Sequence, residues 1–420
     1  MTTQEITQLL DSMGKRARRA SAALAVLPPE AKVQCLESMA QELENNQAKI
    51  LTANQKDVSA AVQAGMDSAK IDRLTLNANR IKGMADGLRQ VASQADPVGK
   101  VLSVNTRPNG LEISKVSVPF GVIGIIFESR PNVTADAAGI CIKAGNAVIL
   151  RGGSEAFESN MAIAGILNDA AKNSGLPDGI CQLIPCTDRE AVKIMLKMDR
   201  YIDLVIPRGG EGLIRTVVAE ATMPVLKHYK GVCHLFVDSD CDVDMAAKII
   251  INAKCSRPAV CNALETLLID RNIAEKFIPL IAEKLTASGV EMRGDACFCS
   301  AVKNALPATE DDFYAEYLNL TLAIRIVGGV EEAVEHINTY GSRHSDGILS
   351  SITENIDYFV ANVDSSTVYV NASTRFTDGG EFGMGAEIGI STDKLHARGP
   401  MGADELTTYK YIVRGNGQIR

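Results

Sequence analysis

The chain has 420 residues, a formal net charge of −8 at pH 7 and 46% hydrophobic residues. This length allows two or three domains, each with its own core, and the negative charge argues against binding to nucleic acid, whose affinity comes from neutralised phosphates. Ten cysteines and five histidines, none in a metal-binding motif such as HExxH, indicate free thiols in a reducing compartment and no metal site. Without an apolar run long enough for a membrane or an export leader, we expect a cytoplasmic protein.

The first hundred residues are predicted to be helical. A Pro-Pro pair at positions 28 and 29 is typical of a helix start, and apolar side chains then recur on one helical face, at Val33, Leu36, Met39 and Leu43. From position 100 the pattern changes to short alternating runs around the turn sequence Pro-Asn-Gly at 108–110, which predicts a β-hairpin. A hairpin without a core of its own is marginally stable, so we expect it to dock on another subunit.

Between positions 119 and 240, short apolar runs alternate with helical stretches. The runs are GVIGIIF, AVILR, CQLIP, IDLVIP and HLFVD. This alternation predicts an α/β fold with a parallel, Rossmann-like sheet.

Two glycine-rich turns follow strands of this predicted sheet. They are RGGS at 151–154 and RGGEG at 208–212, and neither is a GxGxxG fingerprint. Each turn could contact a dinucleotide phosphate or could simply join a strand to a helix. Their position at the ends of two apolar strands favours contact with a cofactor.

A second α/β unit is predicted from about 232 to 396, and it contains a candidate nucleophile, Cys261. Arg257-Pro258 ends a helix before it, and an apolar strand follows from Thr266. Such an irregular corner leaves backbone N–H groups which, with the Asn262 amide, could receive an oxyanion after a thiolate attacks a carbonyl. The alternative is an inert buried thiol. Cys255 is the rival nucleophile, but it belongs to the end of the helix.

Four segments of the chain carry a family resemblance: RPAVCNALETLL, PFGVIGIIFESRPNVT, VEHINTYGSRHSDGI and VYVNASTRFTDGGEFGMGAE. They resemble the aldehyde dehydrogenase superfamily, in the branch whose members reduce glutamyl 5-phosphate to glutamate 5-semialdehyde. The resemblance implies an NADPH-binding Rossmann-type domain at 1–99 and 119–231, an oligomerisation arm at 100–118 and 406–420, a catalytic domain at 232–396 and a return segment at 397–405.

The resemblance also assigns the cofactor site. Related NAD enzymes carry a glutamate that binds the adenosine ribose where this chain has Ser154, and Arg151 lies nearby. A carboxylate would repel a 2′-phosphate, whereas a serine and an arginine would accept one, so NADPH is expected. Pro207, Gly209 and Gly210 are expected on the nicotinamide side. Glu316 matches a glutamate that binds the nicotinamide ribose, although it could equally be a surface carboxylate.

The implied mechanism passes through a thioester on Cys261. Hydrolytic relatives have a glutamate that activates water, but the corresponding stretch here, Lys227 to Gly231, contains no carboxylate. This absence favours phosphate over water as the exchange partner. The oxyanion asparagine of the superfamily falls near Glu128, which cannot donate when ionised, so Asn132 or backbone N–H groups are expected to substitute.

Three arginines are expected to bind the substrate or the thiolate. Arg257 could favour the thiolate form of Cys261, and Arg130 and Arg375 could hold the phosphate and carboxylate of the substrate. Arg130 or Arg375 could instead form an ordinary salt bridge between domains. His336 is expected to be structural, and for His344 both a structural role and a direct role in the site stay open.

The last residues, TTYKYIVRGNGQIR, alternate in polarity and resemble a strand that pairs with the hairpin of a partner subunit. We therefore expect a homodimer or higher homo-oligomer, with glutamate 5-kinase as a further possible partner. A CoA-acylating or hydrolytic aldehyde dehydrogenase and a catalytically inactive, NADP-sensing scaffold of the same fold are the competing hypotheses.

Overall fold

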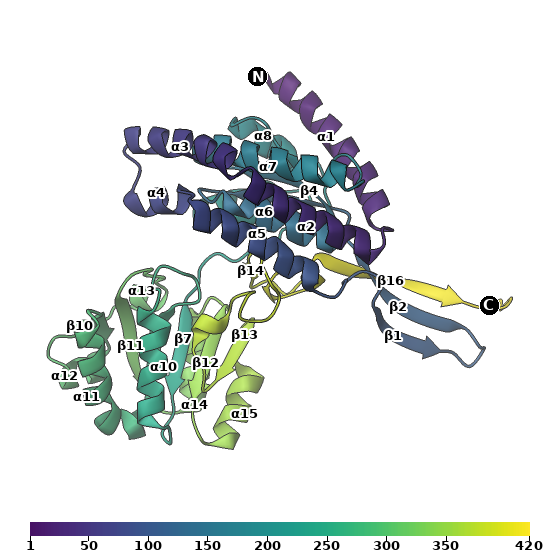
Figure 1. Ribbon diagram of the computed structural model, residues 1–420. Coiled ribbons are helices and arrows are strands. Elements are labelled where there is room, and N and C mark those ends of the chain that lie inside the picture. Colours follow the sequence, from purple (N-terminus) through teal and green to yellow (C-terminus); the bar gives the residue numbers. More distant parts are fainter. The chain divides into compact units, whose positions relative to one another are not determined.

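The structure, a computed structural model, describes all 420 residues and consists of two compact units (Figure 1). The first unit comprises Met1–Lys227, Gly383–Gly389 and Pro400–Arg420, and the second comprises His228–Phe382 and Ile390–Gly399. The units therefore change at residue 228 and not at 232, and the segment 383–389, expected in the catalytic domain, belongs to the first unit.

The N-terminal region is helical, as predicted. Its helices are α1 (Thr3–Leu24), α2 (Pro29–Asn45), α3 (Gln47–Gln63), α4 (Ser68–Leu74) and α5 (Ala78–Ser93). Helix α2 begins at the predicted proline and buries Leu36, Met39 and Leu43, because apolar residues three and four apart share one helical face. It packs against α5 and α7. No helix of the structure combines the length and the apolar character needed to cross a membrane.

A four-stranded parallel sheet forms the core of the first unit. Its strand order is β5-β4-β3-β6, and the strands are β3 (Val122–Phe127), β4 (Ala147–Gly152), β5 (Cys181–Leu183) and β6 (Leu204–Arg208). Every side chain of β3 is buried, as expected for the centre of a sheet covered on both faces. The connecting helices are α6 (Asn132–Lys143), η1 (Ser154–Ala156), α7 (Phe157–Asn173), α8 (Arg189–Met195) and α9 (Glu211–Glu220).

The hairpin forms as predicted, from β1 (Val101–Thr106) and β2 (Glu112–Pro119). Gly110 in its turn has φ +85, which favours glycine. The C-terminal strand β16 (Thr407–Arg414) pairs antiparallel with β2 of the same chain, with Tyr409 opposite Ser117. The expected pairing with a partner's hairpin is therefore wrong, because this edge of β2 is already occupied. The outer strand β1 is exposed along its whole length, and its docking on another subunit stays a prediction.

The second unit is built on a seven-stranded sheet in the order β10-β9-β11-β8-β7-β12-β13, and every pair in it is parallel. The strands are β7 (Cys233–Val237), β8 (Leu264–Asp270), β9 (Glu291–Gly294), β10 (Leu306–Pro307), β11 (Thr321–Val327), β12 (Ser345–Leu349) and β13 (Thr367–Val370). The run HLFVD, expected in the cofactor sheet, thus forms β7 in this sheet.

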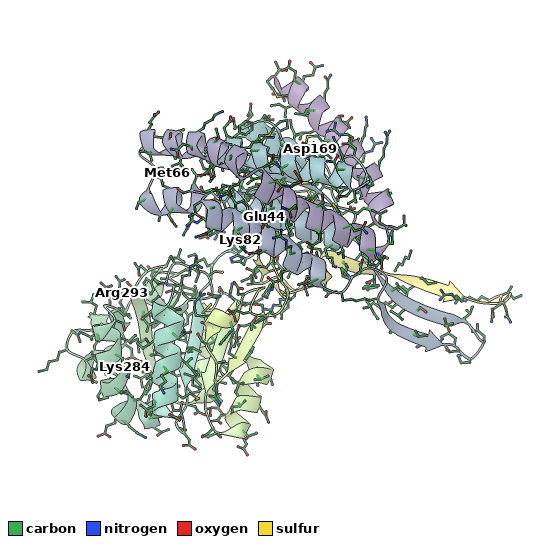
Figure 2. All side chains as sticks on the ribbon, viewed as in Figure 1. Glu44, Met66, Lys82, Asp169, Lys284 and Arg293 are labelled. Atoms are coloured by element: carbon green, nitrogen blue, oxygen red, sulfur yellow. The ribbon has the colours of Figure 1, made fainter.

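Helices cover both faces of the seven-stranded sheet. They are α10 (Val243–Cys255), α11 (Arg271–Ala287), α12 (Ala296–Ala301), α13 (Glu310–Phe313), α14 (Val330–Tyr340), α15 (Thr353–Asn362) and η2 (Thr374–Phe376). One apolar core includes residues of α10 and α11, and a second includes residues of α14 and α15. The remaining short elements are β14 (Ile390–Ser391), β15 (Gly399–Pro400) and η3 (Asp404–Leu406). Charged side chains such as Lys82, Asp169 and Lys284 are exposed on the helices (Figure 2).

Candidate active site

Cys261 lies in the irregular segment between α10 and β8, as predicted. Helix α10 ends at Cys255, so the rival thiol is part of a helix. The carbonyl of Cys261 accepts a hydrogen bond from the Cys233 thiol at 3.2 Å. The backbone at Gly231 packs against the same carbonyl, since a Cβ on Gly231 would lie 1.9 Å from that oxygen. Glycine is therefore required at position 231.

The fold brings two histidines to Cys261. The Sγ atom of Cys261 and one ring nitrogen each of His228 and His344 all lie within 4.8 Å of one another, and the two imidazole rings meet edge to face with centroids 5.6 Å apart. His228 precedes β7 and His344 precedes β12, and these strands are neighbours in the sheet. The three residues are far apart in the chain, so no sequence motif indicated this cluster.

The two histidines have different surroundings. His228 is half-buried, and its Nδ1 lies 2.9 Å from the carbonyl oxygen of Ile390. His344 is completely buried, and its Nδ1 lies 2.9 Å from Ser345 Oγ. Burial, together with the proximity of His228, lowers the pKa of His344 to about 3. His344 is therefore neutral at physiological pH.

A chain of buried hydroxyl groups continues from His344. Ser345 Oγ lies 2.6 Å from Thr377 Oγ1, which in turn lies 2.7 Å from the Tyr369 hydroxyl. Burial raises the pKa of Tyr369 to about 12, so every member of the chain is uncharged at neutral pH. This network fixes the orientation of His344 without introducing a charge.

The Asn262 amide does not point into an open corner. Its Nδ2 donates to the carbonyl oxygens of Arg375, at 3.2 Å, and Thr377, at 2.9 Å, and its Oδ1 accepts from the Arg375 guanidinium. Both N–H groups of the amide are thus used to hold the segment that contains η2. This arrangement contradicts the expected role of the Asn262 side chain as an oxyanion donor.

One of the expected arginines, Arg375, lies near Cys261, and a second, Arg257, lies near Arg375. Burial and the positive charge of Arg257 lower the pKa of Arg375, while Asp378 and Cys261 act in the opposite direction. These electrostatic effects place Arg375 near both Arg257 and Cys261. Arg375 is half-buried and Arg257 is exposed. Two adjacent guanidinium groups repel each other, so a bound anion would stabilise them.

Glu316 is fixed by the same part of the fold. Its Oε1 accepts a hydrogen bond from the Gly231 amide at 2.9 Å. Beneath it, the ammonium of Lys254 lies 2.6 Å from Glu265 Oε2, and both side chains are completely buried. The other oxygen of Glu265 accepts from the Leu318 amide at 3.2 Å. The loop that contains Glu316 is therefore held at Glu316 itself and at Leu318.

In the first unit, Arg151 is the next-to-last residue of β4, and its guanidinium is directed to main-chain carbonyls. Its Nη1 donates to Gly152 O at 2.9 Å and its Nη2 to Thr187 O at 3.1 Å, while its buried Nε has no partner. Burial lowers the pKa of Arg151. Ser154 is exposed at the start of η1. A partly buried guanidinium without an ion pair and an exposed hydroxyl fit the 2′-phosphate of a dinucleotide.

The second glycine-rich turn follows β6, in which Pro207 lies, and Gly209 and Gly210 lead into α9. Oε2 of Glu128 accepts from the Gly210 amide at 2.9 Å, and a Cβ on Gly209 would lie 2.3 Å from the same oxygen. Glycine at 209 thus allows the close approach of Glu128. The carboxylate acts here as an acceptor, which agrees with the expectation that it cannot serve as an oxyanion donor.

Asn132 begins α6, and its Nδ2 donates to Asp136 Oδ2 at 2.9 Å. Burial raises the pKa of Asp136 to about 6, although Asn132 and Arg208 oppose this shift. Arg130 is exposed and lies two residues before Asn132. The expected site residues are divided between the two units. The first unit contains Arg130, Asn132, Arg151, Ser154, Pro207, Gly209 and Gly210. The second unit contains Arg257, Cys261, Asn262, Glu316 and Arg375.

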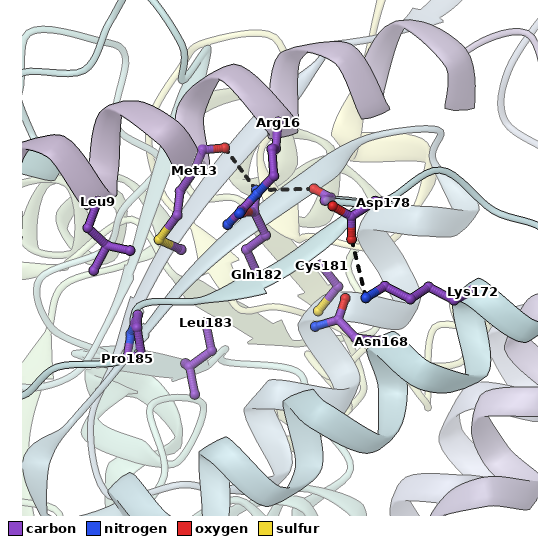
Figure 3. A pocket seen from close by; sticks show the side chains of 11 residues that line it. Leu9, Met13, Arg16, Asn168, Lys172, Asp178, Cys181, Gln182, Leu183 and Pro185 are labelled. Atoms are coloured by element: carbon purple, nitrogen blue, oxygen red, sulfur yellow. Dashed lines mark hydrogen bonds and ion pairs between the residues drawn. The ribbon is translucent and has the colours of Figure 1, made fainter.

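A surface pocket of the first unit is less suited to catalysis. Residues of α1, α7 and β5 line it (Figure 3). Arg16 donates to Gln182 Oε1 at 2.8 Å, and Gln182 donates to Met13 O at 2.9 Å. Its only thiol, that of Cys181, is buried, and burial raises its pKa to about 12. The polar groups satisfy one another, and the thiol is protonated at neutral pH.

Sequence similarity to known proteins gives independent evidence on the family of this chain. The model of the aldehyde dehydrogenase family matches residues 3–305. A gamma-glutamyl phosphate reductase of Geobacter metallireducens is 54% identical over 415 residues, covering 99% of this chain and 99% of the relative. One of Carboxydothermus hydrogenoformans is 54% identical over 409 residues, covering 97% of this chain and 99% of the relative.

Solved structures show the same similarity. The crystal structure of a gamma-glutamyl phosphate reductase from Thermotoga maritima has a TM-score of 0.96 and 46% sequence identity, and the match covers 98% of this chain and 99% of the other. An acetylating aldehyde dehydrogenase from Geobacillus thermoglucosidasius has a TM-score of 0.69 at 18% identity, with 100% of this chain and 99% of the other covered. At that identity the second match shows a shared fold alone.

Proposed function

The chain belongs to the aldehyde dehydrogenase family, and we propose that it reduces L-glutamyl 5-phosphate to L-glutamate 5-semialdehyde with NADPH and releases phosphate, a step of proline biosynthesis. Full-length identity of 54% with gamma-glutamyl phosphate reductases supports the substrate. The observation that carries the proposal is the neighbourhood of Cys261. A half-buried thiol lies beside two histidines, with Arg375 near it and Arg257 near Arg375, which suits a covalent reaction with an anionic acyl phosphate.

In this reaction the thiolate of Cys261 attacks the acyl carbon, the bond from that carbon to the phosphate oxygen breaks, and phosphate leaves. The product is a thioester on Cys261. NADPH supplies a hydride when bound. The resulting thiohemiacetal collapses, its C–S bond breaks with the electron pair returning to sulfur, and the semialdehyde leaves. Arg257 and Arg375 are proposed to hold the phosphate next to the acyl carbon, and Arg130 to bind the substrate carboxylate.

The residues of the first unit support NADPH as the form of the nicotinamide cofactor. Arg151 offers a guanidinium without an ion pair, and the exposed Ser154 adds a hydroxyl. Pro207, Gly209 and Gly210 are proposed to lie along the cofactor, and Glu316 to accept from the nicotinamide ribose. Asn132 and backbone N–H groups are proposed as oxyanion donors, because Asn262 is occupied.

We also propose a cytoplasmic location, a homo-oligomeric state and one protein partner. All ten cysteines are free, which suits the reducing cytoplasm. The exposed outer strand of the hairpin arm supports a homodimer or a higher homo-oligomer. Glutamate 5-kinase makes the labile acyl phosphate and is a candidate partner.

Trapping the covalent intermediate tests this proposal. The protein is incubated with glutamate 5-semialdehyde and NADP⁺ in phosphate-free buffer, quenched in acid and digested. Mass spectrometry should find a glutamyl thioester on the peptide that contains Cys261, and Cys261→Ser should show none, whereas Cys255→Ser should retain it. Absence of the thioester from the unmodified protein, or its presence on another cysteine, contradicts the proposal. Rapid release of the acyl group by CoA but not by phosphate would favour a CoA-acylating enzyme.

A further inference from the structure

The orientation of His228 determines which of its nitrogens can accept a proton. Its Nδ1 lies 2.9 Å from the Ile390 carbonyl oxygen. A carbonyl oxygen can only accept, so Nδ1 must be the protonated nitrogen. In the neutral ring the lone pair is then on Nε2. The Ile390 carbonyl also stabilises the imidazolium that forms when Nε2 takes up a proton. A fixed acceptor of this kind holds the ring of a catalytic histidine in one orientation.

His344 is less suited to accepting this proton. It is completely buried, burial lowers its pKa to about 3, and its Nδ1 is held by Ser345 at 2.9 Å. A positive charge on this ring would be desolvated and would face His228 at a ring distance of 5.6 Å. His228 is half-buried, so its imidazolium retains contact with solvent.

We propose that His228 is a catalytic residue, whose Nε2 takes the proton of the Cys261 thiol when sulfur attacks and returns a proton to sulfur when the thiohemiacetal collapses. This inference deepens the proposed function, since it names the base for the same nucleophile. His228 lies in the Lys227–Gly231 stretch, where hydrolytic relatives carry a glutamate. The fold thus uses this position to activate the thiol.

The proton balance is complete. The S–H bond breaks, its electron pair stays on sulfur and forms the C–S bond, and the proton moves to Nε2. The imidazolium then gives this proton to the leaving phosphate. One proton from solvent enters through His228 to neutralise the alkoxide formed after hydride addition. On collapse the C–S bond pair returns to sulfur, and the hydroxyl proton passes through Nε2 to restore the thiol, so one proton is consumed per turnover.

The rate of alkylation of Cys261 tests this role without substrate or cofactor. The full-length protein is treated with iodoacetamide between pH 5.5 and 9.5, and labelling of the Cys261 peptide is followed by mass spectrometry. A histidine partner should make Cys261 react at neutral pH, where a free thiol is only a few per cent ionised. We expect His228→Gln to slow alkylation at pH 7 about tenfold and to shift the profile towards that of a free thiol. His396→Gln, an exposed histidine of the same unit, should match the unmodified protein.

Other ionisable groups face Cys261 and could also affect its rate of alkylation. They are His344, Cys233 and Arg375. All three remain in His228→Gln, so a change in the profile reports on His228. A second variant, His228→Gly, should regain fast alkylation and fast turnover when imidazole is added, which loss of a merely structural side chain would not allow.

Equal alkylation rates in His228→Gln and the unmodified protein would overturn the inference, as would the absence of any rescue in a folded His228→Gly. Failure of the proposed function gives a different result. In that case the alkylation difference persists, but the unmodified protein does not reduce glutamyl 5-phosphate. If the unmodified protein reduces glutamyl 5-phosphate but His228→Gln is alkylated at the same rate, the proposed function holds and the proposed role of His228 is wrong.

Discussion

The Lys254 ammonium lies 2.6 Å from the Glu265 carboxylate, and both side chains are completely buried on either side of the Cys261 segment. Lys254 comes from α10 and Glu265 from β8. Glu265 also accepts from the Leu318 amide, in the loop that contains Glu316. One ion pair thus connects the two ends of the nucleophile segment to the loop proposed to hold the nicotinamide ribose.

Removing one member of this pair should destabilise the protein strongly. Lys254→Met leaves Glu265 as an unpaired buried carboxylate, which typically costs about 3 to 5 kcal/mol. Urea denaturation should show this loss. The double variant Lys254→Met with Glu265→Leu should recover most of the stability, because it leaves no buried charge. A single variant as stable as the unmodified protein would mean that the pair is not desolvated as the structure shows.

Glu316→Gln separates cofactor binding from folding. The glutamine oxygen can still accept from the Gly231 amide, so the melting temperature should be nearly unchanged. The charged acceptor for the ribose hydroxyls is lost, and KM for NADPH should rise about tenfold, equivalent to ~1.4 kcal/mol. Steady-state kinetics with varied NADPH measures this effect. An unchanged KM would place Glu316 outside the cofactor site and leave it a structural role alone.

Two buried histidines should make the protein sensitive to acid. Burial lowers the pKa of His336 to about 2 and that of His344 to about 3, from 6.5. Below pH 6.5 these two side chains bind more protons in the unfolded chain than in the folded one, so the stability that they contribute is fully present above pH 6.5 and is lost as the pH falls towards 3. The two groups together should contribute about 2.7 kcal/mol per pH unit to the slope, while the buried carboxyls of Asp136 and Glu265, whose pKa values burial raises to about 6 and about 7, contribute with the opposite sign.

His336→Phe should reduce the slope by about 1.4 kcal/mol per pH unit, since one of the two groups is removed. The ring of His336 packs edge to face on Phe313, with centroids 5.1 Å apart. Phenylalanine keeps an aromatic ring at this place, although it removes the Nδ1 that accepts from Arg325. Urea midpoints at pH 7, 6 and 5 measure the slope. The same slope in both proteins would show that His336 is not the neutral buried group that its surroundings indicate.

Ser154→Glu should shift cofactor preference from NADPH towards NADH. A carboxylate at this exposed position would repel the 2′-phosphate and accept from free ribose hydroxyls. The ratio of kcat/KM for the two cofactors should change at least tenfold, about 1.4 kcal/mol. Ser154→Gln is the uncharged control and should change it less. An equal effect of both variants would assign the change to size and not to charge.

Local patterns in the sequence predicted most of the elements but not all of their partners. The apolar runs of β3, β4, β5 and β6 predicted a parallel sheet correctly. The run of β7 has the same pattern but pairs with β8 and β12 in the other sheet, because a short apolar run indicates a strand without indicating its neighbours. Likewise the alternation in the C-terminal segment predicted β16, while the choice of its own hairpin over a partner's depends on tertiary geometry.

In the candidate site, too, local patterns predicted the segments but not the contacts between them. The proline break before Cys261 predicted its irregular segment. The Asn262 amide was expected to face a substrate, but it donates to the carbonyls of Arg375 and Thr377, contacts that no local pattern indicates. The approach of His228 and His344 to Cys261 depends on the pairing of β7 with β12. A signal existed for His228, which lies in the stretch where hydrolytic relatives carry their base.

Phosphate, and not water, is proposed to exchange with the thioester on Cys261. The direct test is NADPH formation from glutamate 5-semialdehyde and NADP⁺, with phosphate varied from zero at constant ionic strength and with arsenate as a second acceptor. Almost no turnover is expected without either anion, with saturable activation by both and one phosphate released per NADPH consumed in the opposite direction. Robust oxidation to free glutamate in phosphate-free buffer would show that water exchanges with the thioester and would indicate a hydrolytic enzyme.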